Sequence, residues 1–531
     1  MIKIYKIYIL IFTLAVTSIL IAGCQADPLQ PIRRPPGIVD RPLEHYGSSV
    51  QEQVYRVFSK SQADYTLPSD PRPPALDGSG NYDYLQVKLI RSSSPGGAWT
   101  TARTRALSSL EKDGFIPSSE KPRLGTYGGD LSRPDTATGF FYTKKENGRW
   151  WMIDPEGYRM LSIGITSFSP AGTAAERAGQ QNVYGDNEAW TKGATAHLKD
   201  DLGFNSLGAW ANDTLIMRYF PFPYTKLIYF VTTYAEEAGL TYQDSGHQSF
   251  RNNVIPVFDP GFEQFADQRA ASTMAKLRDD KYLVGYFSDN ELPAGLTLNN
   301  YLNSPDDEMG KYSRAVAWEW LRRRHGPGAT AANIGGNDLD DFREFVFDYY
   351  AQIVSNAIKH HDPNHMYLGP RLNGGTARTS PGIWRAFGRY CGAIGFNYYS
   401  VWDPDFTILA NWEYWSGKPA ITTEWYTKGM DSGLANYSGA GWVVETQDAR
   451  GLFYEQFVLN LIESGTVVGW HWFKYKDNDP SAPAPDPSNV DGNKGIINTA
   501  FQEYTDLTSR MRITNFNTYR LVDYFVGRNG R

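Results

Sequence analysis

Two glutamates stand in sequence contexts that are typical of catalytic carboxylates. Glu291 closes a Ser-Asp-Asn-Glu motif after the apolar run 282–287, and Glu424 closes a Thr-Thr-Glu motif after the apolar residues 419–421. An apolar run that ends in a carboxylate indicates a buried parallel strand with an acid at its C-terminal end. In an α/β barrel that end carries the catalytic groups, and two carboxylates facing each other there can cleave a glycosidic bond. The motifs therefore predict hydrolysis of a glycoside.

The order of the two motifs assigns a role to each glutamate. Glutamates that end the fourth and seventh strands of such a barrel typically lie about 5–5.5 Å apart, which allows direct nucleophilic attack with retention of configuration. We expect Glu291 to act first as general acid and then as general base, and Glu424 to act as nucleophile. Asn290 is expected to hydrogen-bond a sugar hydroxyl, and Tyr398 or Tyr399 to hold Glu424 in place.

Three aspartates near these motifs are weaker candidates for the same chemistry. They are Asp259, Asp289 and Asp431. Asp259 precedes Pro260, and this pair predicts the start of a helix.

Polar and aromatic residues end most of the other predicted strands. Aromatic side chains combine a flat apolar face with a polar edge, which suits the faces of sugar rings. The predicted substrate-binding residues are Asn290, Trp210, Arg371, Asn397, Tyr398, Tyr399, Trp425, Trp470, His471 and Trp472.

Strand-like apolar runs alternate with helical stretches from residue 140 onward, which predicts repeated βα units. We expect barrel strands at 160–166, 204–210, 225–231, 283–289, 366–371, 393–399, 419–424 and 467–473. The clearest helices are expected at 263–279, 313–325, 340–360, 443–463 and 502–526. The alternative is an open doubly wound sheet, but no Gly-x-Gly-x-x-Gly or P-loop element follows an early strand. The fold class predicted is thus α/β, a (β/α)8 TIM barrel with a small N-terminal extension.

The N-terminal residues predict export and a lipid anchor. A charged start, an apolar middle and Ala-Gly before Cys24 resemble a bacterial lipoprotein signal over residues 1–23, with lipidation at Cys24. A membrane-spanning helix is the alternative, but the apolar stretch is at or below the ~17–25 residues that a span needs. Gln25 and Ala26 after the cysteine favour the outer membrane, on its periplasmic or cell-surface face.

The remaining boundaries follow from composition. A Pro-rich tether is predicted at 24–43, an N-terminal extension packing on the barrel at 44–139, and the catalytic barrel at 140–531. The function of residues 44–139 is not indicated by their sequence.

The net charge and the number and spacing of cysteine and histidine residues limit which partners and cofactors can be expected. The formal net charge of -6 is modest and argues against a nucleic-acid partner. Cys391 is the only cysteine after Cys24, which excludes a Cys-based metal site, and the 8 His show no His-x-x-x-His spacing at a strand end. We therefore expect no metal and no organic cofactor. The expected partners are a polysaccharide or oligosaccharide substrate and a membrane contacted through the lipid anchor.

Several longer stretches resemble glycoside hydrolase family 50, the β-agarases, and their relatives that act on red-algal galactans. These stretches lie at 151–157, 162–166, 203–210, 257–262, 287–293, 439–441, 446–450, 469–473 and 491–493. The resemblance covers roughly 140 to 500 and implies a retaining hydrolase of β-galactosidic bonds in agarose-, porphyran- or carrageenan-type chains. Two alternatives stay open: another retaining β-glycosidase, such as a β-galactosidase or β-glucanase, and a non-catalytic surface glycan-binding lipoprotein.

The chain departs from the family pattern in two places. Typical members carry a sizeable β-domain before the barrel, for which the roughly 100 residues here are too few. Residues 477–489 look like an insertion beside the cleft, and the loops 232–257, 292–312 and 477–495 are expected to shape its ends. Endo or exo action and the preferred galactan depend on these loops and, like the oligomeric state, do not follow from the sequence.

Overall fold

The computed structural model describes most of the chain after residue 41. The described residues are 42–60, 80–91, 97–244, 247–307, 310–482 and 486–529, and they belong to one unit, Arg41–Arg531. The predicted signal peptide, Cys24 and all but the end of the tether lie outside them. No helix in the described part is long and apolar enough to cross a membrane.

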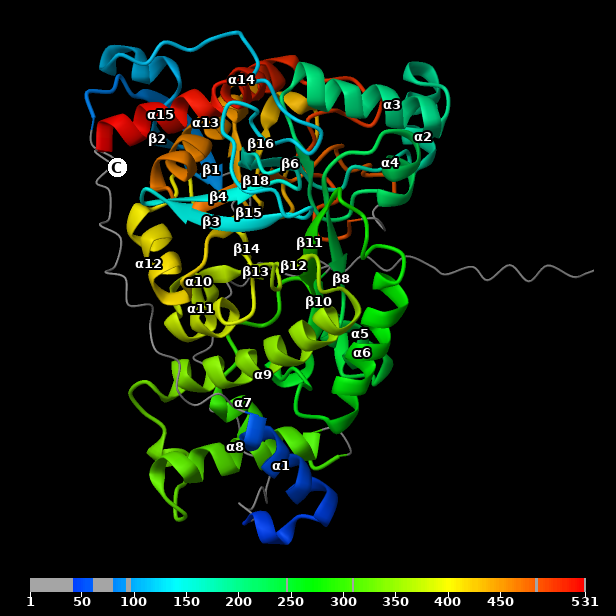
Figure 1. Cartoon of the computed structure of the whole chain (residues 1–531), viewed down its shortest axis with the longest axis vertical. Helices are drawn as coiled ribbons and strands as arrows, with labels where there is room; N and C mark the ends of the chain where they lie inside the picture. Colours follow the sequence, from blue (N-terminus) through cyan, green and yellow to red (C-terminus); the bar gives the residue numbers. More distant parts are fainter. Residues whose placement is uncertain are drawn as a thin grey trace, which may run out of the picture. The chain divides into compact units, whose positions relative to one another are not determined.

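A nine-stranded parallel sheet organises the fold, which is of the mixed α/β class (Figure 1). In spatial order its strands are β12 (Met366–Tyr367), β11 (Leu283–Ser288), β8 (Tyr224–Ile228), β7 (Ser206–Leu207), β6 (Ser162–Ile165), β18 (Val467–Trp472), β15 (Ala420–Glu424), β14 (Ile394–Asn397) and β13 (Leu372–Asn373). Each of the eight predicted strand regions overlaps one of these strands. The region predicted at 366–371 contains β12 and ends just before β13, which the sequence did not predict.

The sheet is curled, because β12 and β13 lie at its two edges yet follow each other closely in the sequence. Leu368, just after β12, donates its amide to Tyr286 in β11 (2.8 Å) and accepts from the amide of Gly395 in β14 (3.0 Å). Asn290 and Arg371 form a further parallel bridge. One short segment therefore contacts both edges of the sheet.

Strands β11, β15 and β18 are buried along their whole length. This burial is expected for parallel strands that are covered on both faces. An inner apolar cluster includes Val284, Phe287, Leu368, Ile421 and Val468. A much larger cluster lies between the sheet and the surrounding helices.

A three-stranded antiparallel sheet contributes to the inner cluster through Met152 and Met160. It consists of β3 (Tyr142–Glu146), β4 (Arg149–Ile153) and β5 (Arg159–Met160). The Trp150 amide donates to Gly465 just before β18 begins, at 2.8 Å. This small sheet therefore lies at the N-terminal ends of the parallel strands, away from the predicted catalytic end.

Helices connect the strands and cover the outside of the sheet. The longer ones are α6 (Pro260–Met274), α8 (Gly310–His325), α9 (Asp338–His361), α12 (Phe406–Ser416), α13 (Gln447–Ser464), α14 (Thr505–Phe516) and α15 (Thr518–Asn529). The others are α2 (Ala174–Val183), α3 (Asn187–Ala196), α4 (Asp213–Tyr219), α5 (Val231–Glu237), α7 (Leu298–Leu302), α10 (Gly374–Thr379) and α11 (Pro381–Gly388). The five predicted helices are present, with the last divided into α14 and α15.

The N-terminal segment packs on the rest of the unit at two places. Helix α1 (Ser48–Lys60) lies against α8 (Figure 1), where the Arg323 guanidinium lies 4.1 Å from the centre of the Phe58 ring. Strands β1 (Leu85–Arg91) and β2 (Thr100–Thr104) join β16 (Thr427–Gly429) and β17 (Trp442–Val444), which follow β15, in the order β16-β17-β1-β2.

A buried ion pair fixes the end of β2 to helix α13. Arg105 donates to Glu463 (2.7 Å) and to Asn460 (2.8 Å), and the side chains of Arg105 and Glu463 are 2% and 1% exposed. Replacing Arg105 with methionine leaves the Glu463 carboxylate buried without this cation. We expect Arg105→Met to lower the free energy of unfolding by about 3–5 kcal/mol in urea denaturation. The exposed pair of Lys112 and Asp83 provides the control, because Lys112→Met is expected to cost less than about 1 kcal/mol. Equal losses of stability from the two substitutions would show that the buried pair of Arg105 and Glu463 matters no more than the exposed pair.

Candidate active site

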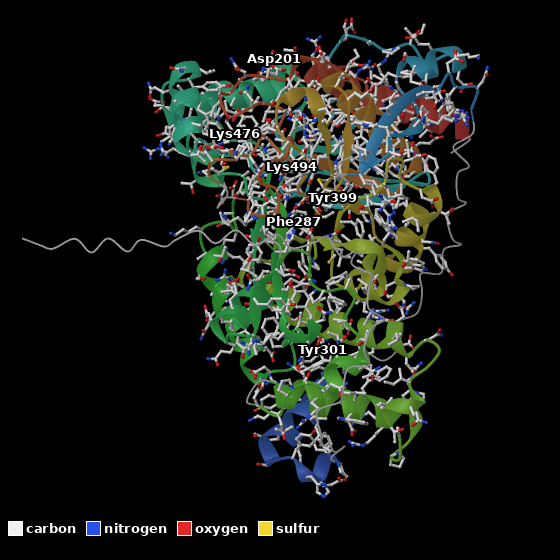
Figure 2. The ribbon with its side chains drawn as sticks, turned by 180° about the vertical axis from the view of Figure 1, so that it is seen from behind. Asp201, Phe287, Tyr301, Tyr399, Lys476 and Lys494 are labelled. Atoms are coloured by element: carbon white, nitrogen blue, oxygen red, sulfur yellow. The ribbon has the colours of Figure 1, made fainter. Side chains whose placement is uncertain are left out.

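A cavity of about 770 Å³ opens at the C-terminal ends of the parallel strands, and both predicted catalytic glutamates line it. Its wall is built from segments that follow successive strands. They contribute Ser167 after β6, Trp210 after β7, Tyr229 after β8, Glu291 after β11, Asn373 at the end of β13, Tyr399 after β14, Glu424 at the end of β15 and Phe473 after β18. In Figure 2, Tyr399, Lys476 and Lys494 lie in the region that holds the sheet, and Tyr301 lies among the helices.

Glu424 is held at both carboxylate oxygens. Arg371 lies 2.7 Å from Oε1, and the hydroxyl of Tyr399 donates to Oε2. Burial raises the pKa of Glu424 to about 7. The positive charge of Arg371 and the hydrogen bond from Tyr399 act to lower this pKa, whereas the nearby Glu291 carboxylate acts to raise it. Of the two tyrosines expected to hold Glu424, Tyr398 and Tyr399, it is Tyr399 that makes this contact.

Glu291 has a different set of partners. The Asn397 amide donates to its Oε1 at 2.7 Å, and Nδ1 of His247 lies 4.0 Å from its Oε2. Asn397 in turn accepts from the hydroxyl of Thr423 at 2.7 Å. The backbone at Glu291 is left-handed, with φ of 54°, a conformation that non-glycine residues adopt rarely and mostly at functional positions.

Arg371 joins the two glutamate environments. Its guanidinium contacts Glu424, donates to Asn290 Oδ1 at 2.8 Å and donates to the Thr423 carbonyl at 2.9 Å. The Arg371 side chain is fully buried and does not line the cavity. Arg371 and Asn397 therefore lie behind the cavity wall, where they contact Glu424 and Glu291.

Trp210 presents an aromatic surface to the cavity. It is 38% exposed, and its indole donates to the Tyr229 hydroxyl at 3.3 Å. The Arg371 guanidinium lies 4.3 Å from its ring centre, close enough for a cation–π contact. A half-exposed tryptophan held in one orientation can stack against a sugar ring.

Four of the predicted binding residues lie elsewhere. Tyr398, Trp425, Trp470 and Trp472 are buried and do not line the cavity. Trp425 stacks on Phe457 of α13 at 4.3 Å, and the Trp470 indole donates to Tyr454 of the same helix at 3.3 Å. Alternate strand residues point to opposite faces of a sheet, and these four face the helices.

His471, between Trp470 and Trp472, points to the inner face of the sheet. Its Nε2 lies 3.0 Å from the hydroxyl of Ser162, and its ring leaves no room for side chains at Gly164 and Gly208. Burial lowers the pKa of His471 to about 3, so the ring is neutral at physiological pH. His471 is also absent from the cavity lining.

The three aspartates that were weaker candidates have structural partners. Asp289 is fully buried and accepts hydrogen bonds from the backbone amides of residues 230–232 and from the Tyr350 hydroxyl. The bonds from the amides hold the start of α5. Asp259 caps α6 by accepting from Gly261 at 2.8 Å, as the Asp-Pro pair predicted. Asp431 accepts from the backbone and side chain of Gln447 at the start of α13.

The sequence did not identify several residues of the wall, most of which lie on two loops. They are Tyr229, His247, Tyr426, Asp486 and Asn489. His247 belongs to the hairpin of β9 (Thr241–Asp244) and β10 (His247–Phe250), within the predicted cleft loop 232–257. The loop 477–495 contributes Asp486 and Asn489, so both loops do line the cavity.

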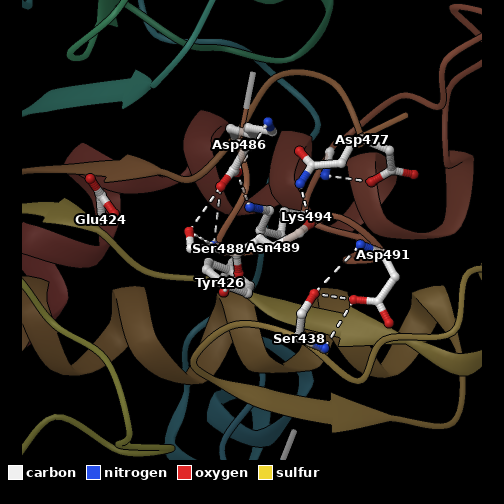
Figure 3. Close-up of polar contacts among 12 residues, drawn as sticks. Glu424, Tyr426, Ser438, Asp477, Asp486, Ser488, Asn489, Asp491 and Lys494 are labelled. Atoms are coloured by element: carbon white, nitrogen blue, oxygen red, sulfur yellow. Dashed lines mark hydrogen bonds and ion pairs between the residues drawn. The ribbon is translucent and has the colours of Figure 1, made fainter. Parts of the chain in front are cut away.

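Figure 3 shows how the second loop is held. Asp486 accepts from the buried ammonium of Lys494, lies 3.5 Å from Lys474 and accepts from Ser488 at 3.0 Å. The Tyr426 hydroxyl donates to Asn489 at 2.9 Å. Burial lowers the pKa of Lys494 to about 7, with the Lys474 charge adding to that effect and Asp486 opposing it.

Known proteins were compared with this chain. No protein-family model matches it. β-Agarase B of Vibrio sp. (strain JT0107) is 22% identical over 580 residues, and β-agarase A of the same strain is 24% identical over 486 residues. These alignments cover 89% and 72% of this chain but 58% and 46% of the relatives, so the chain spans about half the length of the curated relatives it matches.

Solved structures give the same result. The crystal structure of BpGH50 is 27% identical, with a TM-score of 0.74 over 85% of this chain and 98% of that one. The agarase AgWH50C shares the fold at 21% identity, with a TM-score of 0.61 over 76% of this chain and 67% of that one. The resemblance inferred from the sequence motifs is thereby confirmed: the chain is similar to β-agarases in sequence and to glycoside hydrolase family 50 structures in fold.

Proposed function

We propose that this protein hydrolyses β-galactosidic bonds in agarose-type galactans with retention of configuration. The observation that carries the proposal is the pair Glu291 and Glu424, which line one cavity and have unlike partners. The similarity to β-agarases A and B and to BpGH50 supports the substrate class.

The two glutamates contact different side chains, and these contacts suit the two roles of a double displacement. Glu424, oriented by Arg371 and Tyr399, attacks the anomeric carbon and forms a glycosyl-enzyme. Glu291, oriented by Asn397, donates a proton to the departing oxygen and then takes one from the water that releases the product.

We also infer that the curled sheet closes into the (β/α)8 barrel expected from the sequence. The support is the segment 366–373, which pairs with β11 through β12 and with β14 through β13. Counting β12 and β13 as one interrupted strand gives the eight strands of such a barrel.

The charge of the cavity wall favours a neutral galactan. Its carboxylates belong to Glu176, Glu291, Glu424, Asp477 and Asp486, and its ammonium groups to Lys474 and Lys476. Both lysines already contact carboxylates of the wall, Asp486 and Glu176. A densely sulfated chain would meet net negative charge, so agarose is favoured over carrageenan-type chains.

Product analysis on a panel of galactans tests the proposal. Wild type is expected to release oligosaccharides from agarose, and less from porphyran and carrageenan, while Glu291→Gln and Glu424→Ala release at least about a hundredfold less. The lengths of the products distinguish endo from exo action. Hydrolysis of β-glucans instead would support the other retaining glycosidases, and binding by all three proteins without hydrolysis would support the glycan-binding alternative.

The pKa of Glu424 predicts the acid limb of the activity profile. Because the nucleophile must be ionised, and burial raises its pKa to about 7, the acid limb of kcat/KM is expected to have its midpoint near pH 7. Tyr399→Phe removes a hydrogen bond to the ionised form and is expected to move this limb to higher pH. Tyr55→Phe, at an exposed position on α1, is the control and should leave the limb in place. An unchanged limb in Tyr399→Phe would argue against Glu424 as the titrating nucleophile.

The lipid anchor remains a proposal from the sequence alone. We infer that Cys24 is acylated and attaches the protein to the outer membrane, on the basis of the signal-like residues 1–23. Labelling with radioactive palmitate should mark the wild-type protein and not Cys24→Ser, and equal labelling would refute the assignment.

A further inference from the structure

Three side chains from two packed helices meet away from the cavity. Asp267 lies in α6, and His360 and His361 are the last two residues of α9, which packs beside α6 (Figure 1). Nδ1 of His360 and Nε2 of His361 each lie 2.9 Å from Oδ1 of Asp267. The two imidazole rings are 4.4 Å apart, and the three ligand atoms all lie within 4.8 Å of one another.

These distances are close to those between ligands of one metal ion. Zinc binds imidazole nitrogen and carboxylate oxygen at about 2.0–2.2 Å, which places neighbouring tetrahedral ligand atoms about 3.3 Å apart. Opening each 2.9 Å contact by a few tenths of an ångström would therefore admit an ion. The adjacent histidines use different ring nitrogens, which lets both converge on the carboxylate of the other helix.

The surroundings suit a cation. The side chains of Asp267, His360 and His361 are 45%, 69% and 22% exposed, so a hydrated ion can reach them and water can complete its coordination. The two histidines lie in the last turn of α9, where the helix dipole favours positive charge. Among the described residues, no other group of three His, Cys, Asp or Glu side chains has such spacing.

We propose that Asp267, His360 and His361 bind one divalent transition-metal ion, zinc above all, and that this ion links α6 to α9. Two imidazoles and one carboxylate are ligands that zinc, cobalt and nickel accept, whereas calcium and magnesium prefer oxygen ligands. None of the three residues lines the cavity, so the site is independent of the proposed hydrolysis. Its effect is structural: the bound ion stabilises the contact between the two helices. The sequence predicted no metal because adjacent histidines lack the His-x-x-x-His spacing, and the aspartate comes from a distant part of the chain.

Metal binding is tested on the full protein, freed of any affinity tag and of metal by a chelator. Calorimetry with Zn²⁺ is expected to show one ion per chain with a micromolar Kd. Co²⁺ is expected to give the visible absorption bands of an ion bound through imidazole. At a zinc concentration of a hundred times Kd, the melting temperature is expected to rise by about 2–3 °C for a chain of this length.

Two variants and one control decide the outcome. Asp267→Asn and His361→Gln are each expected to weaken zinc binding at least tenfold and to remove the cobalt bands and the rise in melting temperature. The control is His197→Gln, since His197 contacts Asp201 and Glu503 through opposite ring nitrogens and so cannot share one ion with both. Circular dichroism and agarose hydrolysis without metal show that each variant is folded. Absence of stoichiometric binding in wild type, or equal binding in His361→Gln, would overturn the proposal and leave a hydrogen-bonded cluster only.

Discussion

Replacing Glu424 with alanine is expected to lower kcat for agarose hydrolysis at least about 10³-fold, because the substitution removes the group proposed to attack the anomeric carbon. Binding of agarose oligosaccharides should persist, since Trp210 and the rest of the wall are unchanged. The measurement is kcat from reducing-end release, together with calorimetric binding of an oligosaccharide.

Chemical rescue separates loss of the nucleophile from loss of folding. Azide entering the space left by the Glu424 carboxylate should restore turnover of an activated aryl β-galactoside and give an α-galactosyl azide, the product of a single inversion. Retention of more than a tenth of wild-type activity in Glu424→Ala, at an unchanged melting temperature, would exclude Glu424 as nucleophile. Asp289→Asn is the matched comparison, because Asp289 lies near the site but its carboxylate is bound to the start of α5.

Replacing Glu291 with glutamine is expected to reduce hydrolysis of agarose by about 10²–10⁴-fold, because no proton reaches the departing oxygen. The first step should survive on an aryl galactoside whose phenolate leaves without protonation. The glycosyl-enzyme should then accumulate, visible as a burst of phenolate followed by slow turnover. Azide should speed the second step and give a β-galactosyl azide, opposite in configuration to the Glu424→Ala product.

His247 supplies the control for this assignment. Its ring is the titratable group 4.0 Å from Glu291 Oε2, on the exposed hairpin β9–β10. If His247 were the acid, His247→Gln would show the burst and Glu291→Gln would not. We expect the reverse, with His247→Gln retaining the steady-state rate within tenfold.

The strands and both glutamates could be predicted because their signals are local. A run such as 282–287 is apolar throughout, and a strand buried on both faces requires such a run wherever it lies in the fold. The Asp259-Pro260 pair predicted a helix start for the same reason, since capping depends on adjacent residues. One strand was predicted at 366–371, whereas the structure has the short strand β12 there and a second short strand, β13, directly after it.

The face of the sheet to which a strand residue points was harder to predict from the sequence. Trp470, His471 and Trp472 all end a predicted strand, yet the tryptophans face α13 and the histidine faces the inside of the sheet. A shift of one residue in register exchanges the two faces, and aromatic residues are equally suited to a helix contact and to a sugar contact.

By itself, the sequence determined the α/β class, the eight strand regions and the positions of Glu291 and Glu424, because each depends on a few neighbouring residues. The tertiary structure decided which side chains surround those glutamates. Arg371 reaches both sites, and the loop after β18 brings Asp486 and Lys494 to the wall, through contacts between residues far apart in the chain. Such contacts are set by how the strands curl and the loops fold back, and no local pattern encodes them.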